Sequence, residues 1–333
     1  MANATNGRKP SSWRGLSMAI TVLLVAAGVF YVIRHARDFA ALGNLSVVLW
    51  AEIGVLALGS PILLGWCNKV VVGVFGVDLR FSEWFGLTMV GSMANMFAPF
   101  APGAGMRALY LRRVHGLAYV HFANCLAAPL LIGAMVNSSL ALMALILVWR
   151  LHGAVSDALL AAVLVTFAVP LALVLWPMRV GVPENKWLRR LASVINGWRT
   201  VVTQRMAVAE LGAAMVVRTV LLTGIYHLIF DAIDAPAPWL ACLTIASLGS
   251  VARLVNITPG SLGIYEAVLM MTSTSFGISA SAGMMVALVH RLVSSLLIIL
   301  SGSLYGHLLA REVFEAPNNQ DGPSLPSDDD VLT

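Results

Sequence analysis

Charged residues are scarce in this chain of 333 residues. Asp, Glu, Lys and Arg together make up 11% of it, whereas they make up about 25% of a typical soluble domain. Hydrophobic residues reach 59%, and the mean hydropathy is +0.85. This composition excludes an ordinary soluble globular protein and indicates a polytopic membrane protein.

Cysteines and catalytic motifs are also few. Cys67, Cys125 and Cys242 are isolated among apolar residues and form no C-x-x-C pair, so we interpret them as small buried side chains. The sequence contains no H-E-x-x-H, G-x-S-x-G or Walker motif and no cluster of His with carboxylates. We therefore expect neither an enzyme nor a cofactor or metal site, and any transport would use a gradient or run downhill.

Long apolar runs predict the membrane topology. Six of them are near or above the roughly 20 residues that a bilayer crossing needs, at about 16–33, 47–66, 117–148, 155–176, 207–230 and 281–309. Two further runs, about 84–101 and 239–257, each end in a Pro-Gly break and continue as a shorter apolar piece. The sequence thus predicts an all-α polytopic membrane protein with about six full transmembrane helices and two broken, re-entrant helical hairpins.

The net charge of +5 and the pI near 9.4 reflect membrane topology rather than nucleic-acid binding. Most basic residues lie beside apolar runs, as the positive-inside rule predicts, in segments 1–14, 69–80, 107–115 and 179–206 and at Arg311. In the predicted topology these share one side, whereas the loop 231–238 has two Asp and no Lys or Arg. Arg34 and Arg37 are exceptions to this rule, because the predicted topology places them on the outer side. We expect a multi-pass protein of the inner (cytoplasmic) membrane with both termini cytoplasmic.

The chain divides into a transmembrane domain and polar ends. We assign 1–15 to a cytoplasmic N-terminal tail, 16–310 to the transmembrane domain and 311–333 to a disordered acidic C-terminal tail. Between the halves of the domain, 177–206 has apolar residues at helical spacing with basic residues mostly off that stripe. This pattern predicts an amphipathic cytoplasmic linker, which either binds anionic headgroups or serves only as a connection.

The two broken runs resemble each other. The stretch 258–267, TPGSLGIYEA, places proline and glycines before Glu266, so a helix should break there and restart before this carboxylate. Residues 92–95 followed by a Pro-Gly pair parallel residues 250–253 followed by another, at an offset of about 157 residues. In the predicted topology the first run enters the membrane from the cytoplasm and the second from outside, so the repeat is inverted. Inverted repeats are typical of transporters with a site near the midplane. The predicted break residues are Pro99, Pro102, Gly103, Pro259, Gly260 and Gly263.

Five ionisable residues lie deep in the predicted membrane: Arg107, Arg218, Arg253, Glu266 and Arg291. Each arginine buried in the membrane costs at least about 2.5–3.5 kcal/mol on insertion scales. Several such arginines therefore imply negatively charged partners or a water-filled cavity. Glu266 can neutralise one of them, and the surplus requires an anion such as phosphate or carboxylate. The alternative is a structural Arg–Glu pair that locks the broken helices. His290 is interpreted as a packed core histidine on another helix face than Arg291.

The stretch 258–267 resembles the T-P-G-G-L-G-x-x-E-A motif of the flippase-like integral membrane domain of lysylphosphatidylglycerol synthases, which also occurs as stand-alone proteins. The amino-terminal half is similar to the family's N-x-x-x-P-x-x-x-G-[DE]-x-x-R-x-x-x-L-x-R, with Asn95, Pro99, Gly103, Arg107, Leu111 and Arg113 in place. Arg291 stands where the family has a basic residue after a tyrosine. The resemblance spans about 16–310 and implies translocation of lipid between leaflets.

Four positions depart from the family pattern. Ala104 replaces an acidic residue, Pro129-Leu130 replaces a Glu-Arg pair, and His290 replaces the tyrosine. The missing carboxylates weaken the inference that this protein shares the family's substrate or a proton-coupled step, and they leave the expected cavity more cationic than is usual in the family. We do not expect the synthase activity of the fused proteins, because that activity belongs to a separate soluble domain.

These observations predict a flippase or transporter that moves an anionic phospholipid or lipid-linked intermediate between leaflets. The expected substrate-binding residues are Arg107, Arg291, Glu266, Arg253, Arg218 and Asn95. Arg107 and Arg291 would hold the lipid phosphate, and Glu266 would release its arginine as the helices rock. The alternative is a non-catalytic scaffold that presents membrane lipid to a separately encoded transferase. A membrane-embedded transferase ranks third, because acidic residues are missing.

Overall fold

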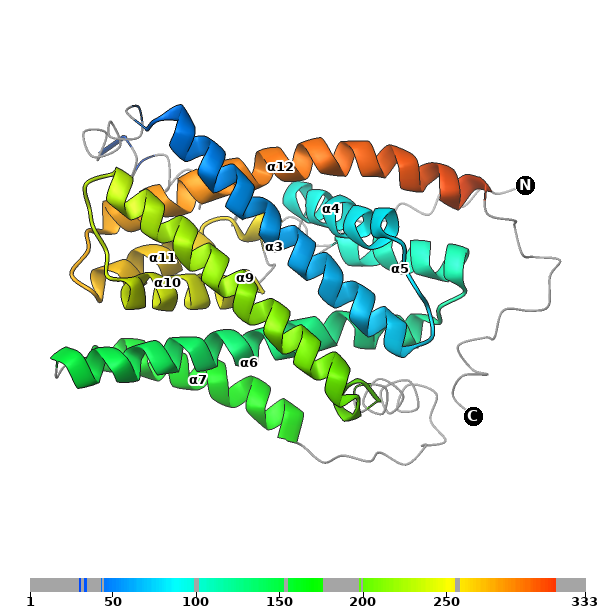
Figure 1. Cartoon of the computed structure of the whole chain (residues 1–333), viewed down its shortest axis with the longest axis horizontal. Helices are drawn as coiled ribbons and strands as arrows, with labels where there is room; N and C mark the ends of the chain where they lie inside the picture. The colour runs from blue at the N-terminus through cyan, green and yellow to red at the C-terminus, as the bar shows by residue number, and fades with distance from the viewer. Residues whose placement is uncertain are drawn as a thin grey trace, which may run out of the picture.

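The computed structural model describes residues 45–98, 102–152, 155–175, 200–254 and 258–315, together with the isolated positions 30, 33, 34, 43 and 198. Within these residues the secondary structure is helical, without strands (Figure 1). The all-α membrane architecture is therefore confirmed. Four predicted features lie wholly or mostly outside the described residues: the first helix 16–33, Pro99, the linker 177–206 and the tail beyond 315.

Four described helices are long and apolar enough to cross a membrane, and they match four of the predicted spanning runs. A fifth predicted span, 155–176, is the apolar 19-residue helix α7. In chain order the elements are α3 (Val47–Val74), α4 (Phe81–Phe97), α5 (Pro102–His115), α6 (Tyr119–His152), α7 (Asp157–Leu175), α9 (Arg205–Ala232), α10 (Trp239–Ala252), η2 (Pro259–Ser261), α11 (Ile264–Thr274) and α12 (Ala280–Glu315). The four long apolar helices are α3, α6, α9 and α12.

The two broken runs form helical hairpins. α4 ends at Phe97 and α5 begins at Pro102; in the second hairpin α10 ends at Ala252, and the short turn η2 precedes α11. Gly260 and Gly263 have φ angles of 57° and 82°, in the left-handed region that glycine adopts without steric cost. The chain can therefore reverse over a few residues and restart a helix directly before Glu266.

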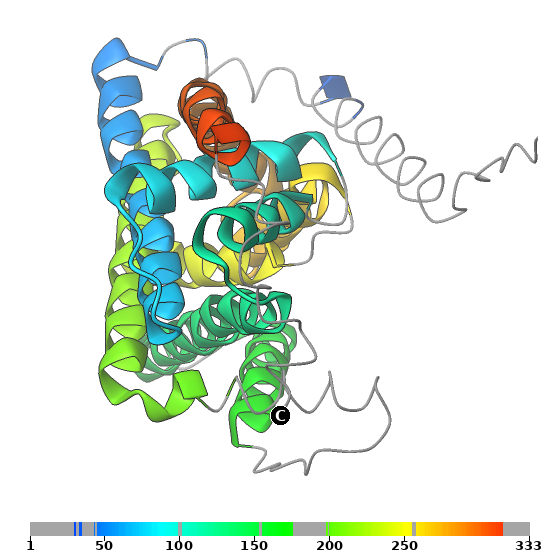
Figure 2. The ribbon, with the colours of Figure 1, turned by 90° about the vertical axis from the view of Figure 1, so that its right-hand side faces the viewer.

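The hairpins lie end to end along α12. Figure 1 shows α4 and α5 at one half of α12, and at the other half α11 beside α12 with α10 next to α11, so the hairpins enter the bundle from opposite ends. Their inner ends meet where η2 contacts α4: a Cβ atom at Gly260 would lie 3.7 Å from the Cα of Met96. Seen from the end of the bundle, α4 and α5 are enclosed between α12, α3 and α6 (Figure 2).

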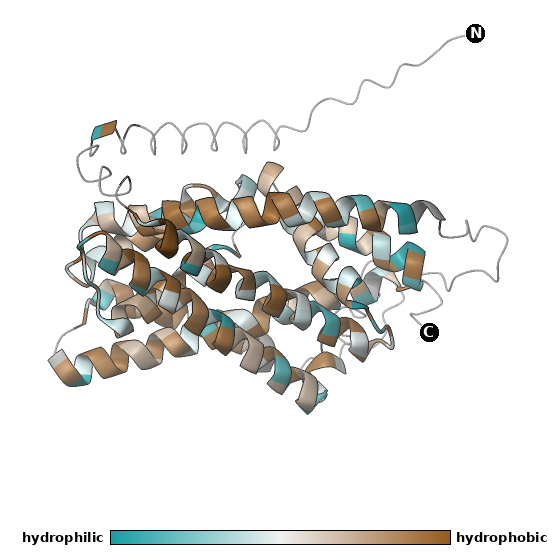
Figure 3. Ribbon diagram, turned by 45° about the horizontal axis from the view of Figure 1, so that its top comes forward, coloured by the Kyte–Doolittle hydropathy of each residue, from teal (hydrophilic) through white to brown (hydrophobic). Residues whose placement is uncertain are grey.

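Most residues along the helices are hydrophobic, with hydrophilic residues interspersed among them (Figure 3). α12 illustrates this arrangement, because one of its faces carries exposed leucines at four-residue spacing, such as Leu300 with 70% of its surface exposed. Such a continuous exposed apolar face suits contact with lipid. Basic residues gather at the end of the bundle where α5 and α12 end and α9 begins: Arg112, Arg113, Arg205 and Arg311.

Candidate functional site

A cavity of about 400 Å³ lies where the two hairpins meet. Its volume falls within the range of about 300–1,000 Å³ that is usual for ligand pockets. Five of the six predicted substrate-binding residues line it: Asn95, Arg107, Arg218, Arg253 and Arg291. Glu266 is the sixth, and it lies directly behind Arg291 rather than on the cavity wall. The fold thus brings together side chains that are up to 196 residues apart in sequence, from Asn95 to Arg291.

Glu266 joins the second hairpin to α12. Its Oε1 lies 2.5 Å from the Nε of Arg291 on α12, and its Oε2 accepts a 2.8 Å hydrogen bond from the backbone N–H of Gly263. The second contact satisfies a free donor at the start of α11. Arg291 in turn donates from Nη1 to the carbonyl oxygen of Gly260, at 3.0 Å. The ion pair therefore fixes the turn η2 between α11 and α12.

Arg253 ends α10 and faces the cavity with donors that the described residues leave unused. Its Nε and Nη2 are buried and have no hydrogen-bond partner in that part of the chain. Its guanidinium carbon lies 4.8 Å from the centre of the Tyr265 ring, and that of Arg291 lies 5.6 Å from the same ring. Two cations thus flank one tyrosine, which partly offsets the cost of burying their charges.

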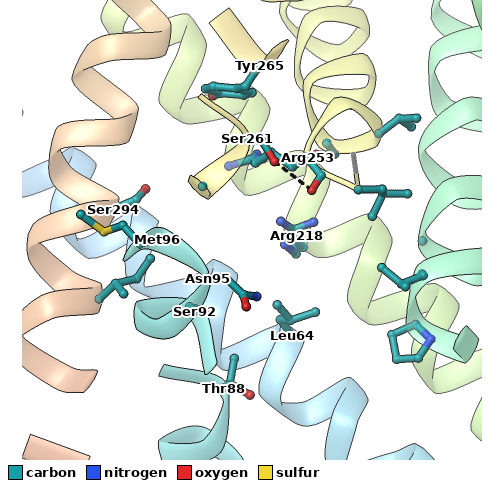
Figure 4. A pocket seen from close by; sticks show the side chains of 18 of the residues that line it. Leu64, Thr88, Ser92, Asn95, Met96, Arg218, Arg253, Ser261, Tyr265 and Ser294 are labelled. Carbon is teal, nitrogen blue, oxygen red and sulfur yellow. Dashed lines mark hydrogen bonds between the residues drawn. The ribbon is translucent and has the colours of Figure 1, made fainter. Parts of the chain in front are cut away.

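Arg218 adds a charge from α9, next to Arg253. Its Nε donates a 2.9 Å hydrogen bond to the Ser60 hydroxyl of α3, which fixes the direction of the side chain. The charges of Arg218 and Arg253 are close enough to repel each other, and Figure 4 shows both beside the cavity. A negatively charged group between them would relieve this repulsion.

Arg107 supplies the charge of the first hairpin. It is on α5, and its recorded hydrogen bond is a long one of 3.4 Å to the carbonyl oxygen of Gly103, one turn earlier. Asn95 holds the hairpin tip, because its Oδ1 accepts a 2.8 Å hydrogen bond from the backbone N–H of Gly103. An asparagine at this point therefore caps the start of α5, and it also borders the cavity (Figure 4).

A buried polar chain behind the arginines was not predicted from sequence. The Tyr226 and Tyr265 hydroxyls contact each other, the Tyr265 hydroxyl lies 3.1 Å from His290 Nδ1, and His290 Nε2 lies 3.2 Å from the Ser294 hydroxyl. His290 is buried, as expected for a packed core histidine, and it also lines the cavity. The position of Tyr265 directly before Glu266 could have indicated that this tyrosine lies near the cavity.

Polar residues on otherwise apolar helices complete the lining. Asn68 of α3 donates to the Thr88 hydroxyl of α4 at 3.2 Å. Asn137 of α6 donates to the Gly133 carbonyl oxygen and accepts from the Thr219 hydroxyl of α9, at 2.7 and 2.9 Å. A polar side chain in a spanning helix usually faces the bundle interior, so both asparagines could have been found from the sequence.

The comparisons with known proteins place the chain in a family. A family model described as the lysylphosphatidylglycerol synthase TM region matches residues 14–302. The chain belongs to this family. The comparison with curated proteins gave no match. Family membership makes the chain a membrane protein related to lipids, and the positions that depart from the family motifs, Ala104, Pro129, Leu130 and His290, all line the cavity.

Proposed function

We propose that the protein is a flippase that moves an anionic lipid between the leaflets of the cytoplasmic membrane. The observation that supports this function best is the convergence of four arginines on one cavity between hairpins that enter from opposite ends. A phosphate in the cavity would be held by Arg107 from one hairpin and by Arg253 and Arg291 from the other. The acyl chains would remain in the bilayer.

Movement of the hairpins would expose the cavity to each leaflet in turn. The tips touch where η2 meets α4, so a small rotation of either hairpin opens one side of the cavity. The Arg291–Glu266 pair would loosen when phosphate takes the place of the carboxylate and would re-form when the lipid leaves. In this proposal the basic end of the bundle faces the cytoplasm.

The test is a leaflet-exposure assay in proteoliposomes with fluorescent anionic and zwitterionic lipids. We expect the anionic lipid to cross, and Arg107→Ala, Arg291→Ala and Glu266→Gln to slow it by about 10- to 100-fold, since a hydrogen bond to a charged group contributes about 1.5–3 kcal/mol. The matched control is Arg311→Ala, an exposed arginine at the end of α12. Absence of translocation with well-folded protein would reject the flippase and favour a scaffold that presents lipid to a separate transferase.

A further inference from the structure

The cavity has more positive charge than a single phosphodiester can neutralise. Its lining, as far as the structure describes it, contains four arginines and no Asp, Glu or Lys. Glu266 compensates Arg291. The ion pairs among the described residues do not include Arg107, Arg218 or Arg253. Three guanidinium charges are therefore uncompensated among the described residues, and a negatively charged ligand could neutralise them.

The free donors face the same space from different helices. Arg253 keeps Nε and Nη2 unbonded, Arg218 is bonded through Nε only, and Arg107 has its long contact to Gly103, among the described contacts. These arginines belong to α10, α9 and α5. A ligand that satisfied all three would need acceptors in several directions, as a terminal phosphate or a diphosphate has.

The described part of the site offers no free carboxylate to an amine. Both oxygens of Glu266 are in use, one by Arg291 and the other by the Gly263 N–H. The described lining of the cavity itself has no carboxylate that could accept an ammonium group. A headgroup that carries an amine would place a further cation next to uncompensated arginines, which is unfavourable in a poorly hydrated cavity.

We infer that the cavity selects lipids whose headgroup ends in a phosphomonoester or a diphosphate, with two or more negative charges, and rejects headgroups that bear an amine. This inference rests on the proposed function for the identity of the site. A phosphomonoester carries a charge of about −1.5 to −2 at pH 7, because its second pKa is about 6. A phosphodiester carries one charge and leaves two of the three arginines uncompensated.

The test is equilibrium binding to the purified full-length protein in nonionic detergent. The probes are short-chain phosphatidic acid, a prenyl diphosphate, phosphatidylglycerol and phosphatidylethanolamine. At pH about 8 we expect the first two to bind at least about tenfold more tightly than phosphatidylglycerol, since each added charge-assisted bond contributes on the order of a tenfold change. Phosphatidylethanolamine should be the weakest. Near pH 5 phosphatidic acid should lose its advantage, because it becomes a monoanion.

Arg253→Gln is the informative variant. It should weaken binding of the prenyl diphosphate by about tenfold or more while affecting phosphatidylglycerol less, and Arg253→Lys should restore part of the loss. The variant should fold, because it removes a buried charge that lacks a hydrogen-bonded partner among the described residues. Arg311→Gln, at the exposed end of α12, should change neither affinity.

The two proposals fail in different ways. Equal affinity for all the anionic lipids, preference for phosphatidylethanolamine, or no binding of any probe would overturn the headgroup inference. Flippase activity toward phosphatidylglycerol in vesicles would then still support transport. Preferential binding of the multiply charged lipids without translocation would retain the inference and reject the flippase.

Discussion

Glu266 is the one carboxylate that touches the arginines of the cavity within the described structure, and it is 7% exposed. Its two oxygens serve different purposes, since one neutralises Arg291 and the other caps α11 through Gly263. The structural and the functional interpretations of this residue are therefore not exclusive. A pair that fixes the turn η2 can also give up its arginine to a ligand.

This dual role predicts strong coupling between Glu266 and Arg291. Glu266→Gln should lower the free energy of unfolding by as much as about 3–5 kcal/mol, because the arginine is left without its partner. The double variant Glu266→Gln/Arg291→Gln should recover part of this loss, since the unpaired charge is removed as well. Unfolding midpoints in detergent measure the cycle. Strictly additive effects of the two substitutions would contradict the assignment of a stabilising pair.

At the scale of the helices, the first hairpin depends on close contact between α4 and α5. A Cβ atom at Gly103 would overlap the carbonyl group of Gly91, so only glycine fits between these helices. Gly105, two residues further along α5, has no atom within 4 Å of the corresponding Cβ position. The two glycines thus form a matched pair in one helix.

Gly103→Ala should force the helices apart and deform the cavity beside Arg107. We expect a loss of about 1–3 kcal/mol in stability, as is usual for overpacking. Gly105→Ala should be neutral or stabilising by up to about 1 kcal/mol, because alanine favours the helix. Thermal unfolding of both variants measures the difference. Equal effects would show that α4 and α5 are not in contact at this point.

A polar cluster joins the outer end of the same hairpin to α12. Glu83 accepts from the Arg80 N–H at 2.7 Å and from the Tyr110 hydroxyl at 2.9 Å, and it lies 2.8 Å from His115 Nε2. The Tyr110 hydroxyl also contacts Glu312 of α12. One hydroxyl has one proton, so its contact with a second carboxylate requires another proton in the cluster.

The cluster predicts a pH-dependent stability. Burial raises the pKa of Glu83, but hydrogen bonds from Arg80, His115 and Tyr110 outweigh burial and bring it below its usual value of 4.5. The stabilisation by Glu83 is therefore complete above pH 4.5 and is lost as the pH falls through the lower folded-state value. The difference in unfolding midpoint between wild type and Glu83→Gln should shrink over that range. A constant difference down to pH about 3 would exclude this linkage.

For the whole molecule, the helix breaks and the buried charges could be predicted from the sequence, but the residues that contact those charges could not. Proline and glycine at 259–263 predict a helix break from backbone geometry alone, and Arg107 and Arg291 stand out because charge in an apolar run is costly. Helices that are apolar nearly all round do not reveal which face turns inward. The tyrosine–histidine chain around Tyr265 and the cluster at Glu83 include contacts between residues 25 and 202 positions apart, so they emerge only from packing.

The proposed alternating access requires the first hairpin to move against α12, and this movement can be blocked. The Cβ of Met93 on α4 lies 3.0 Å from the position of a Cβ at Gly302 on α12, so a small relaxation brings two cysteines to disulfide distance, about 3.8 Å. Oxidised Met93→Cys/Gly302→Cys should bind lipid but translocate it at least about tenfold more slowly, because opening on one side is prevented. Reduction should restore the rate, and each single cysteine variant is the control. The native cysteines Cys67, Cys125 and Cys242 are buried, which limits competing disulfides. Undiminished translocation by the fully oxidised protein would mean that the lipid crosses without movement between α4 and α12, and the cavity would then be a static pathway.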